Sequence, residues 1–455
     1  MNYASFRSNL CVMVFHLFFR LASIPAFLIW LLAAPLQAQG LLRDADLEYG
    51  LKQLATPILS AAGLSPSRVK ILVVNAPSRN AFVVSNDAIF VHYGLINQMQ
   101  SAAMLQAVLA HEAAHIANGH ITRRMTNLAS ARTASGLGLA LAAVAAVAGA
   151  GDAAGGIALG TQGSARARFL KHTRAEEGSA DQSGIRFMAS AGVDPQGMAD
   201  VLDLFRGQEI LAETRQDAYL RSHPLSRDRL RAVQGFVAAY GNTGTEDPSA
   251  AYWFERVKGK LNAYTRSPKW TLGRLKDSPY ADVRLLREAI AEHRQSRTKQ
   301  AMRAIDAAIA QRPNDPFLHD QRGQILLETR NFQAATAAYG RAVQLAPNDA
   351  LLLSGYGGAL LASGDIRRAR SVLEKARGID FRDGSMLRDL SVAYAKSGQN
   401  GMAALVTAER YALAGRLKDA GVHAKRAVGL LSTGAAPWQR AQDVLIASER
   451  AAKRR

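Results

Sequence analysis

The sequence predicts an α+β chain that is mostly α, with a small antiparallel sheet in an N-terminal domain followed by an all-α repeat superhelix. Two observations carry this prediction. Clear strand character is confined to residues 69–95, and a long stretch with helical spacing of apolar residues follows it. Beyond residue 279, small side chains and prolines recur with a period of about 34 residues, which is typical of stacked helix pairs.

Residues 1–38 have the features of a cleaved export signal. Arg7 and Arg20 precede an apolar stretch from Leu21 to Ala34, and small residues follow at a suitable cleavage point. The alternative is an uncleaved anchor, but Arg20 interrupts the apolar sequence before it reaches the roughly 18–20 residues that a span needs. Cys11 is the only cysteine and lies in this segment. The mature chain would therefore contain no cysteine, which suits an oxidising compartment such as the periplasm.

The 455-residue chain has a formal net charge of +19, spread along its length and not gathered with aromatic residues in one stretch. A protein that binds nucleic acid usually concentrates its basic residues on one surface. We therefore expect no nucleic-acid partner. Diffuse positive charge is better suited to peripheral contact with an anionic membrane surface or with acidic proteins.

Three short apolar runs predict the strands of the sheet. They are Val69–Val74, Ala81–Val84 and Ala88–Val91, and turn-forming residues separate them. From Leu95 onwards the apolar residues follow helical spacing instead.

Residues 136–160 consist almost entirely of Ala, Gly, Leu and Val, and the run is too short to cross a bilayer. Three structures remain open for this segment: a mobile lid, a segment that dips into a membrane surface, and a tightly packed helical hairpin. A polar, turn-rich stretch at residues 242–249 predicts a domain boundary. We accordingly expect an N-terminal domain at residues 39–250, a helical linker at 251–278, and repeats with C-terminal capping helices at 279–455.

The repeat is visible in several independent positions. Three sets of residues share one constant interval: Ala301, Ala335, Ala369 and Ala403; Gly323, Gly357 and Ser391; and Pro279, Pro313 and Pro347. This pattern resembles the tetratricopeptide repeat, a pair of antiparallel helices whose copies stack into a superhelix. Residues 400–455 are expected to be helical but to leave the register.

The first motif whose residues could bind a metal and catalyse a reaction is His111-Glu112-Ala113-Ala114-His115. Residues four apart project from one helix face, so His111 and His115 can both reach a single zinc ion. Such an ion keeps an open position for water, and Glu112 would take a proton from that water as it attacks a peptide carbonyl.

A third zinc ligand is expected from the next helical stretch that contains acidic residues. Glu177 and Asp181 share one face of that helix, whereas Glu176 points elsewhere and is the lesser candidate. We predict that Glu177 binds the metal and that Asp181 accepts the other ring N–H of a ligating histidine.

His120 follows the histidine pair at a spacing unlike that of zinc sites built from three histidines. On a continuing helix it would face away from His111. We therefore expect that His120 is not a ligand.

Three stretches in this order resemble the zinc peptidase family that includes the CAAX prenyl proteases and HtpX: His111–His115, Thr173–Asp181, and His223-Pro224 with Arg229. The resemblance covers nearly the whole mature chain and implies a zincin-like metallopeptidase domain. Thr173 stands where serine is common. Together with the export signal and the repeats, the chain is most similar to the periplasmic members of the family. This implies a chaperone-like role beside cleavage, with outer-membrane β-barrel proteins and their assembly machinery as clients and partners.

The resemblance also places His223, on a loop before Pro224, beside the zinc. Two roles are open for it: it could be a fourth ligand that keeps the enzyme latent, or it could stabilise the oxyanion of the intermediate. Arg229, with its permanent charge, is the better oxyanion candidate.

The sequence thus predicts a periplasmic zinc metalloendopeptidase whose repeats recruit protein clients. An edge strand is expected to pair with an extended substrate backbone, through residues Ala88, Ile89, Phe90, Val91 and His92. The alternative is a repeat scaffold or chaperone with a vestigial metal site. The intact Glu112 argues against this alternative.

Overall fold

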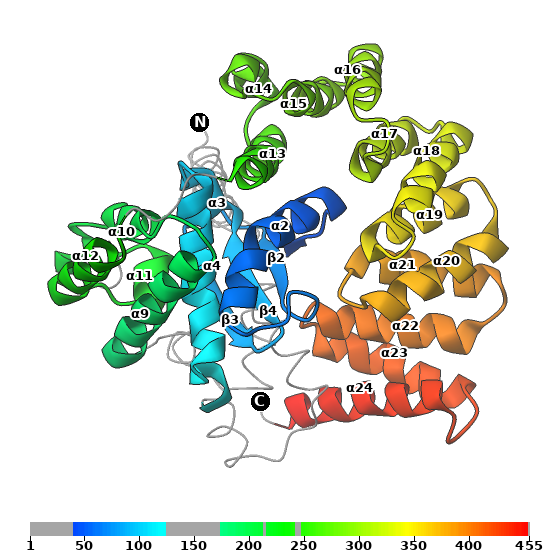
Figure 1. Ribbon diagram of the computed structural model, residues 1–455. Coiled ribbons are helices and arrows are strands. Elements are labelled where there is room, and N and C mark those ends of the chain that lie inside the picture. The colour runs from blue at the N-terminus through cyan, green and yellow to red at the C-terminus, as the bar shows by residue number, and fades with distance from the viewer. Residues whose placement is uncertain (1–39, 124–172, 213–214, 242–246, 454–455) are drawn as a thin grey trace, which may run out of the picture. The chain divides into compact units, whose positions relative to one another are not determined.

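The computed structural model describes residues 40–123, 173–212, 215–241 and 247–453 (Figure 1). The export signal expected at residues 1–38 and the apolar segment 136–160 lie outside the described residues. Within the described ranges, no helix combines the length and the apolar character that crossing a bilayer requires.

The sheet contains four strands in the order β1-β2-β4-β3. They are β1 (Leu41–Leu42), β2 (Lys70–Val74), β3 (Ala81–Ser85) and β4 (Ala88–His92). The β1–β2 and β3–β4 pairs are antiparallel, but β2 and β4 run parallel. The prediction of a wholly antiparallel sheet was therefore wrong. The second strand of the β3–β4 hairpin, and not the first, inserts beside β2.

The prediction that Ala88–His92 forms an edge strand was also wrong. This strand, β4, pairs with β2 on one side and with β3 on the other, and all five of its residues are buried. The outer strand on that side of the sheet is β3. The short turn at Asn86-Asp87 dictates that β3 and β4 pair, but nothing local decides which of the two strands lies outside.

Helix α4 (Ala102–Ala117) lies at the centre of the N-terminal part and is buried almost throughout. On one side of α4 in Figure 1 lies α2 (Ala45–Ala61), and on the other side lie α9 (Arg174–Ser190), α10 (Gln196–Asp203), α11 (Ala218–Ser222) and α12 (Arg227–Tyr240). The short helix α3 (Tyr93–Gln98) directly follows β4. Gly184 of α9 packs directly on α4. A Cβ at this position would lie 3.3 Å from the backbone nitrogen of His111. The glycine therefore lets α9 lie close to α4 at the level of the histidine motif.

Helix α13 (Pro248–Thr265) joins this core. Its residues Phe254, Val257 and Leu261 are buried in the same apolar cluster as the side chains of α2 and α4. The short helix α14 (Pro268–Leu272) follows. The domain boundaries expected at residues 250 and 278 remain predictions, but this packing groups α13 with the N-terminal part.

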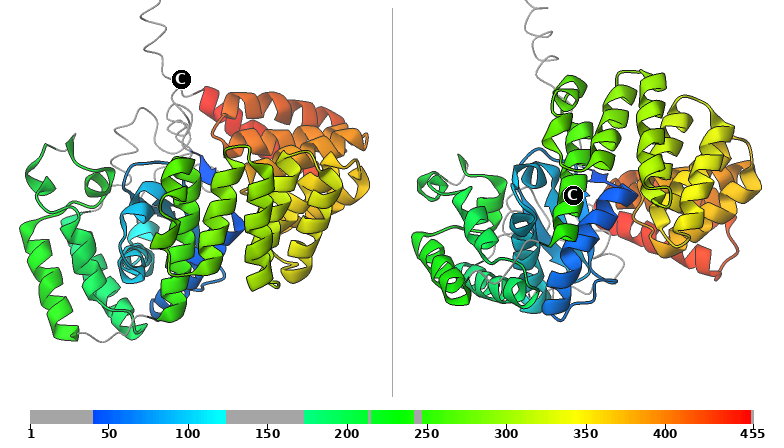
Figure 2. Two further views of the ribbon diagram at one scale, coloured as in Figure 1. Left: turned by 90° about the horizontal axis from the view of Figure 1, so that it is seen from above. Right: turned by 45° about the horizontal axis from the view of Figure 1, so that its top comes forward.

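The repeat region consists of helices that lie side by side in antiparallel succession (Figures 1 and 2). Every second helix begins one sequence period after its predecessor: α16 (Thr298–Gln311), α18 (Phe332–Leu345), α20 (Ile366–Ile379) and α22 (Asn400–Leu413). Between them lie α15 (Ala281–His293), α17 (Pro316–Glu328), α19 (Ala350–Ala362) and α21 (Gly384–Lys396), and α23 (Leu417–Leu430) and α24 (Ala436–Ala452) follow. The register thus continues through α22, past residue 400 where it was expected to end, and α23 begins within one residue of it.

The small residues of the repeat occur where two helices touch. A Cβ on Gly323 would lie 2.7 Å from the ring of Tyr339, and a Cβ on Gly357 would lie 2.5 Å from Leu373. Tyr339 and Leu373 are themselves separated by the same interval as the two glycines. The period seen in the sequence is therefore the period of one repeated helix contact.

Candidate active site

Helix α4 presents both motif histidines to one point. The Nε2 atoms of His111 and His115 lie 3.1 Å apart, and both side chains are fully buried. Glu177 of α9 reaches the same point, with its two carboxylate oxygens 3.4 Å from His111 Nε2 and 3.3 Å from His115 Nε2. The expected convergence of the two helices is therefore present in the structure.

The start of α9 explains why Glu177, and not Glu176, faces the histidines. Thr173 is the N-cap of the helix, and its backbone N–H donates to the Glu176 carboxylate at 2.9 Å in a reciprocal capping box. The Glu176 carboxylate is therefore engaged in capping the helix. The next residue, Glu177, points inward and is fully buried.

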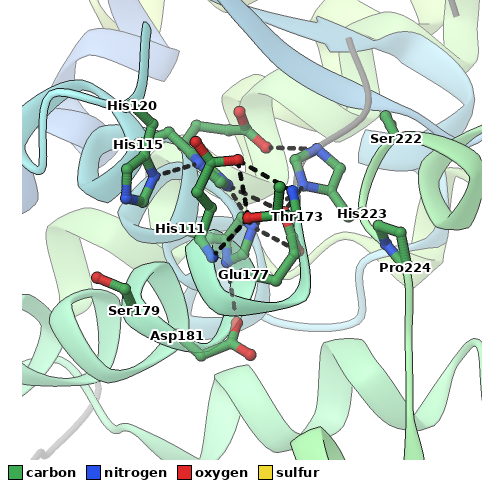
Figure 3. A network of polar contacts seen from close by, with 12 residues as sticks. His111, His115, His120, Thr173, Glu177, Ser179, Asp181, Ser222, His223 and Pro224 are labelled. Atoms are coloured by element: carbon green, nitrogen blue, oxygen red, sulfur yellow. Dashed lines mark hydrogen bonds and ion pairs between the residues drawn. The ribbon is translucent and has the colours of Figure 1, made fainter. Parts of the chain in front are cut away.

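His223 completes a group of four donors that we call the four-donor cluster: His111, His115, Glu177 and His223. One ligand atom from each lies within 4.8 Å of all the others (Figure 3). His223 follows the end of α11, and its Nδ1 lies 2.9 Å from Glu177 Oε1 and 3.2 Å from His111 Nε2.

The Nε2 atom of His223 is 3.2 Å from the carbonyl oxygen of Ala81 in β3. A carbonyl oxygen can only accept, so His223 Nε2 must carry the proton of this hydrogen bond. The lone pair of a neutral His223 then lies on Nδ1, the atom directed toward His111 and Glu177. This orientation is the one that a fourth ligand needs.

Asp181 lies behind the first histidine. Its Oδ1 accepts a hydrogen bond from His111 Nδ1 at 2.9 Å, the contact that the helix spacing predicts (Figure 3). The proton held on Nδ1 leaves the lone pair of His111 on Nε2, which faces the cluster.

Arg229 contacts two carboxylates of the site, and its expected role toward an oxyanion remains a prediction. Its Nε and Nη2 donate to Asp181 at 2.5 and 2.9 Å, and its Nη1 lies 2.6 Å from Glu177 Oε2. Nη1 also donates to the carbonyl oxygen of Pro224 at 3.2 Å. These contacts direct the guanidinium at Asp181 and Glu177. The geometry makes Arg229 a residue that positions these two carboxylates.

The charges around the cluster shift the pKa values of its members. Burial would raise the pKa of Glu177 and of Asp181, but Arg229 and the nearby histidines hold both below the ordinary range. Burial lowers the pKa of His111, but Glu177 and Asp181 outweigh this effect and raise it to about 10. The centre of the site therefore favours positive charge.

Glu112 lies beside the cluster. Among the described residues, neither of its carboxylate oxygens has a hydrogen-bond partner, and both are buried. Burial raises the pKa of this carboxyl group. His223 Nε2 lies 3.3 Å from Oε1 of Glu112. Burying a carboxylate without a hydrogen bond costs stability.

The site fits a divalent cation. Glu112, Glu177 and Asp181 would carry three negative charges against the single positive charge of Arg229, when the histidines are neutral. The difference is two negative charges. Imidazole nitrogens and a carboxylate are suitable donors for such an ion.

The structure contradicts the expected direction of His120, whereas its expected role as a non-ligand remains a prediction. His120 is not one of the four donors. It does not face away from the site, however, because its Nδ1 lies 2.9 Å from His115 Nδ1. The assumed continuous helix does not exist: α4 ends at Ala117, and Gly119 has a φ of +69° that redirects the chain.

Two other features of the site were not predicted from the sequence. Tyr219 is buried, with its ring centroid 4.7 Å from that of His223. Burial, together with the charge of Glu112, raises its pKa well above the ordinary value, so the phenol keeps its proton. The carbonyl oxygen of Ala81 is the other feature. Backbone groups have no signal in a sequence, whereas Tyr219 could have been noticed by its spacing from His223.

Comparison with known proteins agrees with this geometry. Residues 42–237 match the model of Peptidase family M48, and residues 326–391 match a tetratricopeptide repeat model. The chain is therefore a metallopeptidase with tetratricopeptide repeats. Its N-terminal part is similar to peptidase family M48.

Several characterised proteins are similar to the chain. The beta-barrel assembly-enhancing protease of Escherichia coli K12 is 24% identical over 388 residues, which cover 84% of this chain and 78% of that protein. The metalloprotease LoiP of the same organism is 28% identical and covers 45% of this chain. The mitochondrial metalloendopeptidase OMA1 of Schizosaccharomyces pombe is 28% identical over 40% of this chain. The first of these relatives aligns with both the peptidase domain and the repeats.

Proposed function

We propose that this chain is a periplasmic zinc metalloendopeptidase with chaperone-like activity, which acts in the quality control and assembly of outer-membrane β-barrel proteins. The four-donor cluster with Glu112 beside it is the observation that carries the enzymatic part. The name of the relative that aligns with 84% of the chain supports the cellular role. The repeats would recruit clients and the assembly machinery. A repeat scaffold with a vestigial site is the weaker candidate, because every residue of the zinc site is present and buried.

Each residue of the site has a separate role in the proposed reaction. Zinc, when bound, polarises the substrate carbonyl and lowers the pKa of water, so that attack is feasible at neutral pH. His111, His115 and Glu177 hold the ion, and Glu112 takes the proton of the attacking water and passes it to the leaving amine. Asp181 orients His111, and Arg229 fixes Asp181 and Glu177.

The proposal predicts about one zinc ion per mature chain, measured by elemental analysis after dialysis. His111→Ala, His115→Ala and Glu177→Ala should each reduce this content, because each removes one ligand. Glu176→Ala is the matched control. It is adjacent to Glu177 but serves the helix cap, so it should cost about 1 kcal/mol of stability and leave the zinc content unchanged. Full zinc content in the Glu177 variant would place the third ligand elsewhere.

We further propose that the structure represents a latent state, in which the segment Tyr219–His223 occupies the position of the substrate. An extended substrate would pair with the outer edge of β3, in place of the β4 residues expected from the sequence. Two carbonyl groups are already engaged there, that of Ala81 in β3 and that of Arg79, two residues before the strand. Arg79 O accepts from the backbone N–H of Tyr219 at 3.0 Å, and Ala81 O accepts from His223. The segment Tyr219–His223 therefore covers both the strand edge and the fourth ligand position.

A small polar network holds this segment in place. Arg79 forms an ion pair with Asp217, and Gln208 Nε2 donates to the same carboxylate at 2.6 Å. The Arg79 and Asp217 side chains are 31% and 19% exposed, so solvent weakens their attraction. Such a pair is worth about 0.5–1 kcal/mol.

Asp217→Asn should therefore raise the rate of casein cleavage by about two- to fivefold, because the segment would leave the strand edge more often. Initial rates at low and moderate salt provide the measurement, and added salt should raise the rate of the parent in the same direction. Asp203→Asn is the control, since Asp203 pairs with Arg206 at an exposed position. A slower Asp217 variant, or equal effects in both variants, would contradict this role.

A further inference from the structure

The two histidines of the motif have different partners on their second ring nitrogens. Nδ1 of His111 donates to a carboxylate, Asp181, which Arg229 holds in turn. Nδ1 of His115 faces another imidazole, with His120 Nδ1 at 2.9 Å (Figure 3). The two rings are 5.0 Å apart between centroids and meet edge to face.

This contact is built into the fold. His120 is 2% exposed, and the left-handed turn at Gly119 brings it back toward the last turn of α4. A residue with a side chain at position 119 would be strained in this conformation. His120 is thus a buried polar side chain whose Nδ1 lies within hydrogen-bond distance of a residue of the four-donor cluster.

The contact fixes which nitrogens carry protons. Nε2 of His115 lies 3.1 Å from His111 Nε2 and 3.3 Å from Glu177 Oε1, so it is the atom directed at the centre of the site. A ligating nitrogen must present a lone pair, which leaves the proton of a neutral His115 on Nδ1. His120 Nδ1 must then accept this proton's hydrogen bond, and the His120 proton must lie on Nε2.

We propose that His120 is a positioning residue for zinc binding: it accepts the Nδ1–H of His115 and so holds the imidazole in the tautomer and orientation that ligation needs. The inference rests on the proposed zinc site. It assigns the second motif histidine a neutral acceptor, where the first has a carboxylate.

Two variants of the full mature chain separate this role from simple packing. Asparagine has an oxygen near the position of the histidine Nδ1, so His120→Asn retains an acceptor. Leucine is of similar size and has none. Competition with a chromophoric chelator should show zinc affinity about tenfold to a hundredfold weaker in His120→Leu, as for other partners of ligating histidines. The affinity of His120→Asn should stay close to that of the parent. The visible spectrum of the cobalt-loaded proteins should change in the leucine variant alone.

A second measurement needs no variant. Long-range ¹H–¹⁵N correlation spectra of the zinc-loaded parent, with histidine ¹⁵N labelling, report which ring nitrogen is protonated. We expect a proton on Nδ1 of His115 and on Nε2 of His120. A proton on His120 Nδ1 would overturn the proposal, as would parent-like affinity in His120→Leu or equal losses in both variants. A parent that binds no zinc would instead overturn the proposed function itself.

Discussion

Glu112→Gln is expected to retain zinc and to lose about a hundredfold to ten-thousandfold of its cleavage rate, the range that a general base contributes. The amide has the size of the carboxylate but cannot take a proton from the attacking water. Glu112 is not one of the four donors. The metal site should therefore remain intact.

The same substitution should not destabilise the fold. The Glu112 oxygens are buried without a hydrogen bond among the described residues, so the neutral amide removes a charge that is poorly compensated. We expect a melting temperature equal to that of the parent or higher. Casein cleavage, zinc content and thermal unfolding of the two proteins test the three statements together. Cleavage at the parental rate by a zinc-loaded Glu112→Gln protein would show that the metal site is not the catalytic centre.

Features set by local periodicity could be predicted from the sequence. The helix that carries His111 and His115 follows from apolar spacing, and the four-residue interval alone places both rings on one face. The contact of Asp181 with His111 follows from its four-residue distance from Glu177. The repeats follow from a period that reflects one recurring contact, such as the one between Gly323 and Tyr339.

Features set by long-range packing could not be predicted. The order of strands β3 and β4 depends on which strand inserts beside β2, and both strands are apolar enough for either position. Arg229 carries a charge that suits an oxyanion as well as a carboxylate, and only the folded chain shows that two carboxylates surround it. The direction of the His120 side chain depends on where helix α4 ends, and the left-handed turn at Gly119 sets this end.

His223→Ala is expected to cleave model substrates, and itself, faster than the parent. In the structure the His223 ring donates to Ala81 O on the strand edge and directs Nδ1 at the cluster. Removing the ring frees the carbonyl group that an extended substrate needs and opens the fourth position for water. If His223 covers the site in about nine tenths of the parent molecules, only about one tenth can bind substrate. Removing the ring should then raise the rate about tenfold, because the rate is proportional to the fraction of molecules that can bind substrate.

The zinc affinity of the same variant should fall somewhat, since one donor is lost while three remain. A double variant, His223→Ala with Glu112→Gln, should be inactive and should not degrade itself, which would assign the added cleavage to this site. The opposite result has a defined meaning. If His223 stabilises the transition state, its loss should slow cleavage by about a hundredfold, as for the loss of an oxyanion donor. The position of His223 between the strand edge and the cluster favours the first outcome, because one ring covers both places that a substrate and its attacking water require.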